Sequence, residues 1–226
     1  MTHTLHRVLE LTENNFENDI VVMMMAAKGF NKDQSAEKKK EFLRIVGNFD
    51  PVNFGEGVRL QLPDKLNGKN VQFLNEIIKT FNDDSTPTAV FDNPEKVEGL
   101  IKELKKRDLG LSVIVSGNVE MIEKLLKKQD LSMLPYAVEH RVRKKDDPVG
   151  IYGNYYLLPS LHEIEIESMC GHGMIPYSLI QRVSIDLKLG RIDIDSASKI
   201  LERPCSCGIF NHEKAKEILR HIKEGE

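Results

Sequence analysis

The chain of 226 residues has only three cysteines and no long apolar segment. A small, odd number of cysteines argues against a disulfide framework, which needs pairs and an oxidising compartment. The longest apolar run, residues 20–27, has eight residues, whereas a helix that crosses a bilayer needs about 20. The first residues carry histidines and acids instead of the basic start and apolar centre of a secretory signal. We therefore expect a cytoplasmic protein with no membrane partner.

Neither positive nor negative charge dominates the sequence. The 32 lysines and arginines nearly balance the 35 acidic residues, and the formal net charge is −3. This balance predicts no nucleic-acid partner, because such proteins carry a clear basic excess or patch. The sequence also lacks the P-loop, the dinucleotide-binding glycine motif, the serine-hydrolase elbow and the H-E-x-x-H zinc helix. Several common enzyme classes are thereby excluded, and a small molecule is the expected ligand.

Apolar periodicity predicts an α/β fold. Residues 19–28 form a Met-rich apolar run typical of a buried central strand, and shorter strands are expected at 88–91 and 111–115. Helices are expected at 34–46, from about 70 to 81, from Pro94 with Asn93 as its N-cap, and from residue 119. Residues 47–68 have the composition of a loop. The strands and helices from residue 88 onward alternate as in a βαβ-type sheet domain. We expect this domain to span residues 1–160.

Two further segments alternate with period two, residues 136–143 and 161–167. We expect them to form an antiparallel hairpin in which Arg141 or Arg143 approaches Glu163 or Glu165. The amphipathic segments 176–189, 194–202 and 211–224 then predict a small all-helical C-terminal tail. Residues 161–226 are thus expected to be a metal-binding helical region packed on the α/β domain.

The strongest chemical signal lies in two loops of this tail. One loop carries Cys170 and His172, the other carries Cys205 and Cys207, and together they contain every cysteine of the chain. Both loops contain glycine and precede a helix N-terminus, which favours the thiolate form that binds metal. Three thiolates and one imidazole complete a first shell for zinc or for an iron–sulfur cluster. The sequence therefore predicts one Cys3His metal centre, with the cluster slightly favoured.

Other interpretations of these loops remain. A buried cysteine can simply be a small apolar residue, and the C-x-C spacing differs from the two to four residue spacing usual for zinc. His212, at the start of the last helix, is an alternative fourth ligand to His172.

A second set of candidates lies where predicted strands end. In α/β sheets, ligands bind at the carboxyl ends of parallel strands. If the strands are parallel, three such ends share one crevice. The predicted ligand-binding residues are Lys28, Asn31, Asp92, Ser116, Gly117 and Asn118. Each of these turns is also explained as an ordinary strand-to-helix connection with a capping residue.

Two functions follow from these features. The first is a metalloprotein, a redox or lyase-type enzyme acting on a small molecule at the Cys3His centre, with no catalytic residue identified. The second is a ligand-binding or regulatory module without catalysis, in which zinc staples the helical tail. DNA binding through the helices at 176–189 and 194–202 is a third idea, against which the balanced charge argues. The sequence does not predict the oligomeric state.

Overall fold

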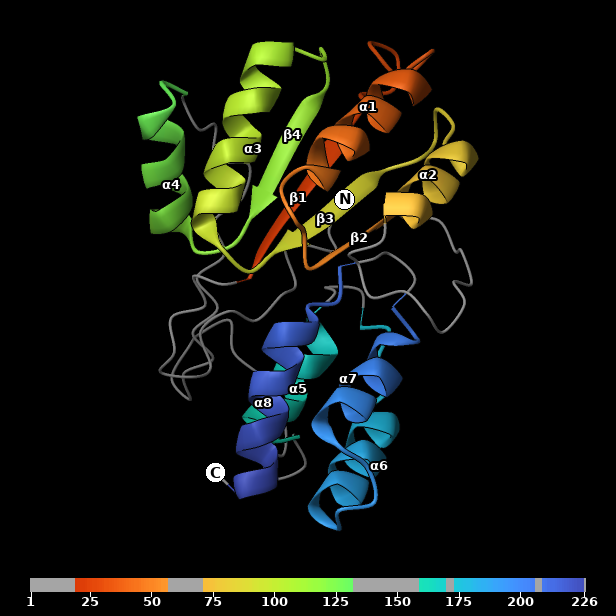
Figure 1. The fold of residues 1–226 in the computed structure, drawn as a ribbon, viewed down its shortest axis with the longest axis vertical. Helices are drawn as coiled ribbons and strands as arrows, with labels where there is room; N and C mark the ends of the chain where they lie inside the picture. Colours follow the sequence, from red (N-terminus) through yellow and green to blue (C-terminus); the bar gives the residue numbers. More distant parts are fainter. Residues whose placement is uncertain (1–18, 57–70, 132–158, 170–172, 206–208, 226) are drawn as a thin grey trace. The chain divides into compact units, whose positions relative to one another are not determined.

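The structure is a computed structural model that describes residues 19–56, 71–131, 159–169, 173–205 and 209–225. The described residues belong to two compact units (Figure 1). We call the first the sheet unit, which lies within Glu17–Leu134 and Cys205–Lys214. We call the second the helical unit, which lies within Pro135–Pro204 and Ala215–Glu226. Each unit is described by itself.

The sheet unit is built on a four-stranded antiparallel sheet with the order β2-β3-β1-β4. Its strands are β1 (Ile20–Met25), β2 (Asn53–Glu56), β3 (Pro87–Phe91) and β4 (Ser112–Ser116). Strand β1 is central, as its apolar run predicts, and all but the last of its residues are buried. In the register, Ile20 lies opposite Phe91 on β3, and Val21 lies opposite Ser116 on β4.

Four helices accompany this sheet: α1 (Ala36–Gly47), α2 (Val71–Thr80), α3 (Pro94–Arg107) and α4 (Val119–Lys128). All four contribute apolar side chains to one core, together with Ile20, Val22 and Met24 from a single face of β1. The helices therefore cover that face of the sheet (Figure 1). Strands β3 and β4 are joined through α3 and run in the same direction on either side of β1. This is a split βαβ arrangement.

The mixed helix and strand fold is confirmed, with two corrections to the predicted sheet unit. The predicted loop at 47–68 contains β2, a short strand with asparagine, glycine and glutamate, residues that strands usually disfavour. The second is that the three strands are not all parallel, which was the condition for a single crevice. Strand β1 inserts between β3 and β4 and is antiparallel to both. A continuous apolar run fits a parallel strand, but here it belongs to an antiparallel strand that is buried on both faces.

The helical unit contains α5 (Leu161–Ser168), α6 (Tyr177–Lys188), α7 (Ile194–Glu202) and most of α8 (His212–Glu224). The last three are the helices that the sequence predicts for the tail. The hairpin is wrong, because residues 161–167 are helical. Ser160 and Glu163 form a capping box that starts α5, with reciprocal side-chain to backbone hydrogen bonds. The other expected strand, residues 136–143, lies outside the described residues.

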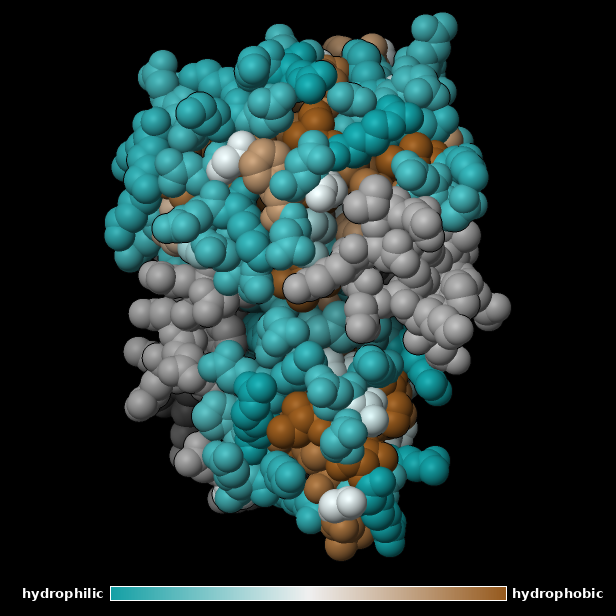
Figure 2. All heavy atoms as spheres, viewed as in Figure 1, coloured by the Kyte–Doolittle hydropathy of each residue, from teal (hydrophilic) through white to brown (hydrophobic). Residues whose placement is uncertain are grey.

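The surface in the view of Figure 2 is mainly hydrophilic, with some apolar atoms over the sheet unit and an apolar patch on the helical unit. Among the described residues of the helical unit, the exposed large apolar side chains are Met174, Ile185 and Leu189. No helix in the described ranges has the length and apolar character needed to cross a bilayer.

Candidate functional site

Only one of the four predicted metal ligands falls within the described part of the chain. Cys205 is buried in the sheet unit, while Cys170, His172 and Cys207 lie outside the described residues. Among the described residues, no group of three histidines, cysteines or acids is arranged to hold a metal ion. The Cys3His centre therefore stays a prediction.

The described residues beside the two cysteine loops do have the expected local geometry. Gly173, directly after His172, has φ of +61°, and a Cβ there would lie 2.8 Å from Oε1 of Glu167. The positive φ favours glycine here, whereas the end of the flexible Glu167 side chain could move away from a Cβ. At the second loop, Asn211 caps α8, because its Oδ1 accepts a hydrogen bond from the backbone N of Lys214 (3.2 Å). The ring of His212, the alternative ligand, makes an edge contact with Phe210.

The predicted ligand-binding residues lie at two opposite edges of the sheet. We call one the Asp19 edge, where β1 begins and β3 and β4 end. It carries Asp92, Ser116, Gly117 and Asn118. We call the other the Asn31 edge, where β1 ends and β3 and β4 begin. It carries Lys28 and Asn31. The single crevice that parallel strands would have produced is therefore absent from the described sheet, because β1 runs the other way.

At the Asp19 edge, the predicted residues have structural partners. Asn93 and Asn118 cap α3 and α4, accepting from Glu95 N (2.7 Å) and Met121 N (3.0 Å). The Nζ of Lys96 contacts Oδ1 of Asp92 at 2.9 Å and also reaches Asp50. Burial opposes the charged form of Lys96, but hydrogen bonds and charges, first from Asp92 and then from Asp50, raise its pKa overall.

A buried polar network, which the sequence did not predict, also lies at this edge. Asn211 Nδ2 donates to Asp19 Oδ1 (3.0 Å), and Lys214 Nζ lies 3.3 Å from Asp19 Oδ2. Asp19 and Asn211 are fully buried, and Lys214 is 4% exposed. An ion pair removed from water in this way is rare and strongly dependent on its partners. We call these three residues the Asp19 network.

At the Asn31 edge, Asn31 closes the turn after β1. Its Oδ1 accepts from Ala27 N (2.7 Å), and its Nδ2 donates to the carbonyl of Gly110 (2.8 Å) just before β4. Residue types suggest this role, because glycine and asparagine are both typical of turns, and Gly29, two residues before Asn31, has φ of +83°. Lys28 is exposed.

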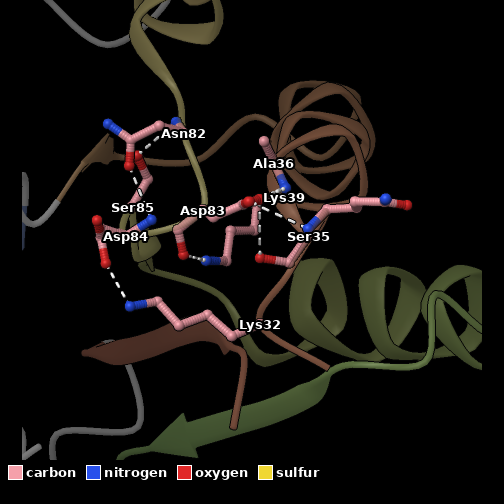
Figure 3. A network of polar contacts seen from close by, with 9 residues as sticks. Lys32, Ser35, Ala36, Lys39, Asn82, Asp83, Asp84 and Ser85 are labelled. Carbon is pink, nitrogen blue, oxygen red and sulfur yellow. Dashed lines mark hydrogen bonds and ion pairs between the residues drawn. The ribbon is translucent and has the colours of Figure 1, made fainter. Parts of the chain in front are cut away.

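A second polar network at the Asn31 edge surrounds the start of α1 (Figure 3). Asp83, from the α2–β3 loop, accepts hydrogen bonds from the backbone N of Ala36 (2.8 Å) and of Gln34 (3.0 Å). Lys39 Nζ donates to the carbonyl of Asp83 (2.6 Å), and Lys32 pairs with Asp84. We call these residues the Asp83 network. Lys39 is buried, whereas its neighbour Lys38 is exposed.

The Asp83 network gives α1 its N-terminal cap from a distant part of the chain. Ser35, at the N-cap position, makes no capping hydrogen bond of its own. The hydrogen bonds from Ala36 and Gln34 lower the pKa of Asp83, because they stabilise its ionised form. The carboxylate also lies at the positive end of the α1 dipole.

The helical unit contains a third polar cluster, made of His162, Glu165 and His221. The two imidazole rings stack with their centroids 5.7 Å apart, and Nδ1 of His162 lies 3.7 Å from a carboxylate oxygen of Glu165. Glu165 is fully buried. His162 is in the first turn of α5 and contacts α8.

Comparisons with known proteins give no match: no family model, no curated protein and no solved structure matches this chain at a significant level.

Proposed function

We propose that this chain is a metalloprotein in which Cys170, His172, Cys205 and Cys207 hold one metal centre. The observation that carries the proposal is the confinement of all three cysteines to two short glycine-containing loops, each leading into a helix. Thiolate and imidazole are the ligands that zinc and iron–sulfur clusters take. An iron–sulfur cluster is slightly favoured over zinc, because glycine has no side chain that would obstruct backbone amides from donating to cluster sulfurs.

Two features of the described residues support this proposal. Helices α6 and α8 begin at Tyr177 and His212, so each cysteine loop does precede a helix N-terminus, where thiolate is favoured. Gly173, directly after His172, has a positive φ, a conformation typical of the tight turns that a loop around a small ion needs.

The proposed activity is a redox or lyase-type reaction on a small molecule in the cytoplasm. The strand-end residues Lys28, Asn31, Asp92 and 116–118 are the proposed contacts for that molecule. Asp92 and 116–118 share one edge of the sheet, and Lys28 and Asn31 share the opposite one.

A regulatory or ligand-binding module with structural zinc is the second candidate. One observation favours it: Asn31, Asp92 and Asn118 all have hydrogen-bond partners within the fold. Side chains already used for turns, caps and ion pairs need no ligand to explain them. The two candidates differ in the metal and in whether it keeps an open coordination position.

The deciding experiment is elemental analysis of anaerobically purified protein, with acid-labile sulfide and the absorption spectrum. Iron with sulfide and absorbance near about 400 nm would support the cluster, and one zinc per chain without colour would support the module. The Cys205→Ala variant should lose the metal, whereas Ser206→Ala, between the two cysteines, should retain it. Comparing His172→Ala with His212→Ala identifies the fourth ligand. Metal-free wild-type protein, or full occupancy in Cys205→Ala, would refute the shared centre.

A further inference from the structure

Helix α6 has apolar side chains on two opposite faces, and only one of these faces is buried. Ile180, Val183 and Leu187 are buried on the inner face. Ile185 is 56% exposed, and Leu189, the C-cap residue of the helix, is 60% exposed. Because a helix has about 3.6 residues per turn, positions 185 and 189 lie one above the other and roughly opposite position 187. We call this exposed side the outward face of α6.

The outward face also carries one charge of each sign, on either side of Ile185 along the helix. Arg182, three residues before Ile185, is exposed and pairs with no acid among the described residues. Asp186, one residue after Ile185, pairs with Arg191 at 3.0 Å and keeps 25% of its side chain exposed. A partner that covers the apolar residues of this face must therefore also match a cation followed by an anion.

A second copy of the same face matches this charge order when the two helices run antiparallel. With a two-fold axis beside Ile185, Arg182 of each copy lies opposite Asp186 of the other, and the two Ile185 side chains meet at the axis. The same alignment places Leu189 over the half-buried Leu179 of the second copy. In a parallel alignment, Arg182 would lie beside Arg182 and Asp186 beside Asp186, so like charges would repel.

We infer that the outward face of α6 binds a second copy of this chain as an antiparallel helix pair. Exposed apolar residues that are grouped on one face and bordered by charges are typical of protein interaction sites. The charge order selects the occupant, because it complements itself only in the closed, two-fold arrangement. The face is smaller than the roughly 20–30 residues per side of a stable interface, so the dimer should be weak, with a Kd of about 10 µM to 1 mM.

The test is sedimentation equilibrium of the full-length protein, kept anaerobic and reduced so that cysteines form no cross-links. Between about 10 µM and 1 mM the wild type should change from mainly monomer to mainly dimer. Ile185→Glu places two carboxylates at the axis and should raise the Kd by about 10-fold or more. Arg182→Glu should raise it by about 5- to 10-fold, because two acids then face each other. Adding Asp186→Arg to Arg182→Glu should restore most of the association, because opposite charges face each other again.

Matched controls introduce the same charge outside the outward face of α6. Phe30 is 92% exposed on the sheet unit, and Arg220 is exposed on α8. Phe30→Glu and Arg220→Glu should leave the Kd unchanged. Circular dichroism of each variant checks that its helices are intact, so that a change in association is not a loss of folding.

Several results would overturn the inference. A wild type that stays monomeric at the highest concentration would show that a second copy is not the partner of this face. Association that survives Ile185→Glu, or that continues beyond a dimer, would assign it to another surface. If Ile185→Glu does not fold, the charge variants decide: a double variant that associates no better than Arg182→Glu refutes the antiparallel alignment. None of these variants changes a proposed metal ligand, so a negative result leaves the proposed function standing.

Discussion

The two polar networks of the sheet unit use the same residue types in opposite environments. In the Asp19 network, a carboxylate and a lysine are both buried and face each other at 3.3 Å. In the Asp83 network, the carboxylate is only half-buried and faces backbone N–H groups, while the buried lysine, Lys39, faces a neutral carbonyl. Both networks join segments that are distant in sequence.

This difference indicates that the number of contacts in a network does not determine how much the network stabilises the fold. Charges in a buried pair depend on each other, because neither can be solvated when the other is lost. The Asp83 carboxylate can be solvated in part when its partners are lost, so each of its contacts contributes less. We therefore expect disruption of the Asp19 network to cost far more than disruption of the Asp83 network.

The largest effect is expected from Asp19→Asn, which leaves the Lys214 ammonium buried without the carboxylate that it faces. Breaking a buried ion pair on one side typically costs about 3–5 kcal/mol of unfolding free energy. Urea denaturation followed by circular dichroism measures this loss. The double variant Asp19→Leu with Lys214→Met removes both charges and should recover part of it. A loss below about 1 kcal/mol in Asp19→Asn would remove the distinction between the two networks.

A smaller effect is expected from Lys39→Met, which keeps the buried aliphatic stem but removes the hydrogen bond to the Asp83 carbonyl. A hydrogen bond of this kind, from a charged donor to a neutral acceptor, contributes about 1.5–3 kcal/mol. The matched comparison is Lys214→Met, where the group left behind is a buried carboxylate. Equal losses in the two lysine variants, measured by the same urea titration, would contradict the comparison.

The sequence predicts much of the local structure of both networks but not the networks themselves. The helices that follow Asn93 and Asn211 could be predicted, because caps and apolar stripes are local patterns. Asp19 and Lys214 are 195 positions apart, so no spacing rule connects them. Asp83 and Ala36 are 47 positions apart, and Ser35 occupies the usual place of the cap without acting as one.

Two differences between the predicted and the observed fold have different physical causes. Helix α5 has only eight residues, and its alternating isoleucines and glutamates also fit a strand. The capping pair Ser160 and Glu163 was the local signal that distinguishes the two. Strand direction has no such local signal. Whether β1 lies beside β3 in parallel or antiparallel depends on how the whole chain closes its sheet. For the metal centre, residue types and loop composition allow a prediction, whereas ligand distances do not follow from sequence.

The Asp83→Ala variant tests the more exposed network directly. Removing the carboxylate takes away the only side-chain acceptor in Figure 3 that serves both Gln34 N and Ala36 N at the start of α1. The melting temperature should fall by roughly 4–8 °C, as for other lost helix caps. Asp84→Ala, at the neighbouring exposed position, is the control and should change it much less. An unchanged melting temperature in Asp83→Ala would show that water replaces the carboxylate without cost.

The acid dependence of stability should also reflect Asp83. Its pKa is lowered in the folded protein, mainly by the hydrogen bonds from Ala36 and Gln34. A group with a lowered pKa stabilises the fold above its unfolded pKa of about 3.9, and this contribution is lost as the pH falls through the folded pKa. Asp83→Asn should therefore lose less stability than the wild type between about pH 5 and pH 2. Identical pH dependence of the melting temperature in the two proteins would contradict this assignment.

The smallest effect is expected at the exposed ion pair between Asp195 and Lys216. Its atoms are 2.9 Å apart, closer than the 3.3 Å between Lys214 and Asp19, yet 69% of the Asp195 side chain is exposed. The hydrogen bond and charge of Lys216 lower the pKa of Asp195, but water screens this carboxylate. Asp195→Asn and Lys216→Met should each shift the melting temperature by no more than about 2 °C. The shift in melting temperature should be smaller still at about 1 M salt, where the Debye screening length is about 3 Å. A larger loss that persists at high salt would show that burial does not govern the strength of these ion pairs.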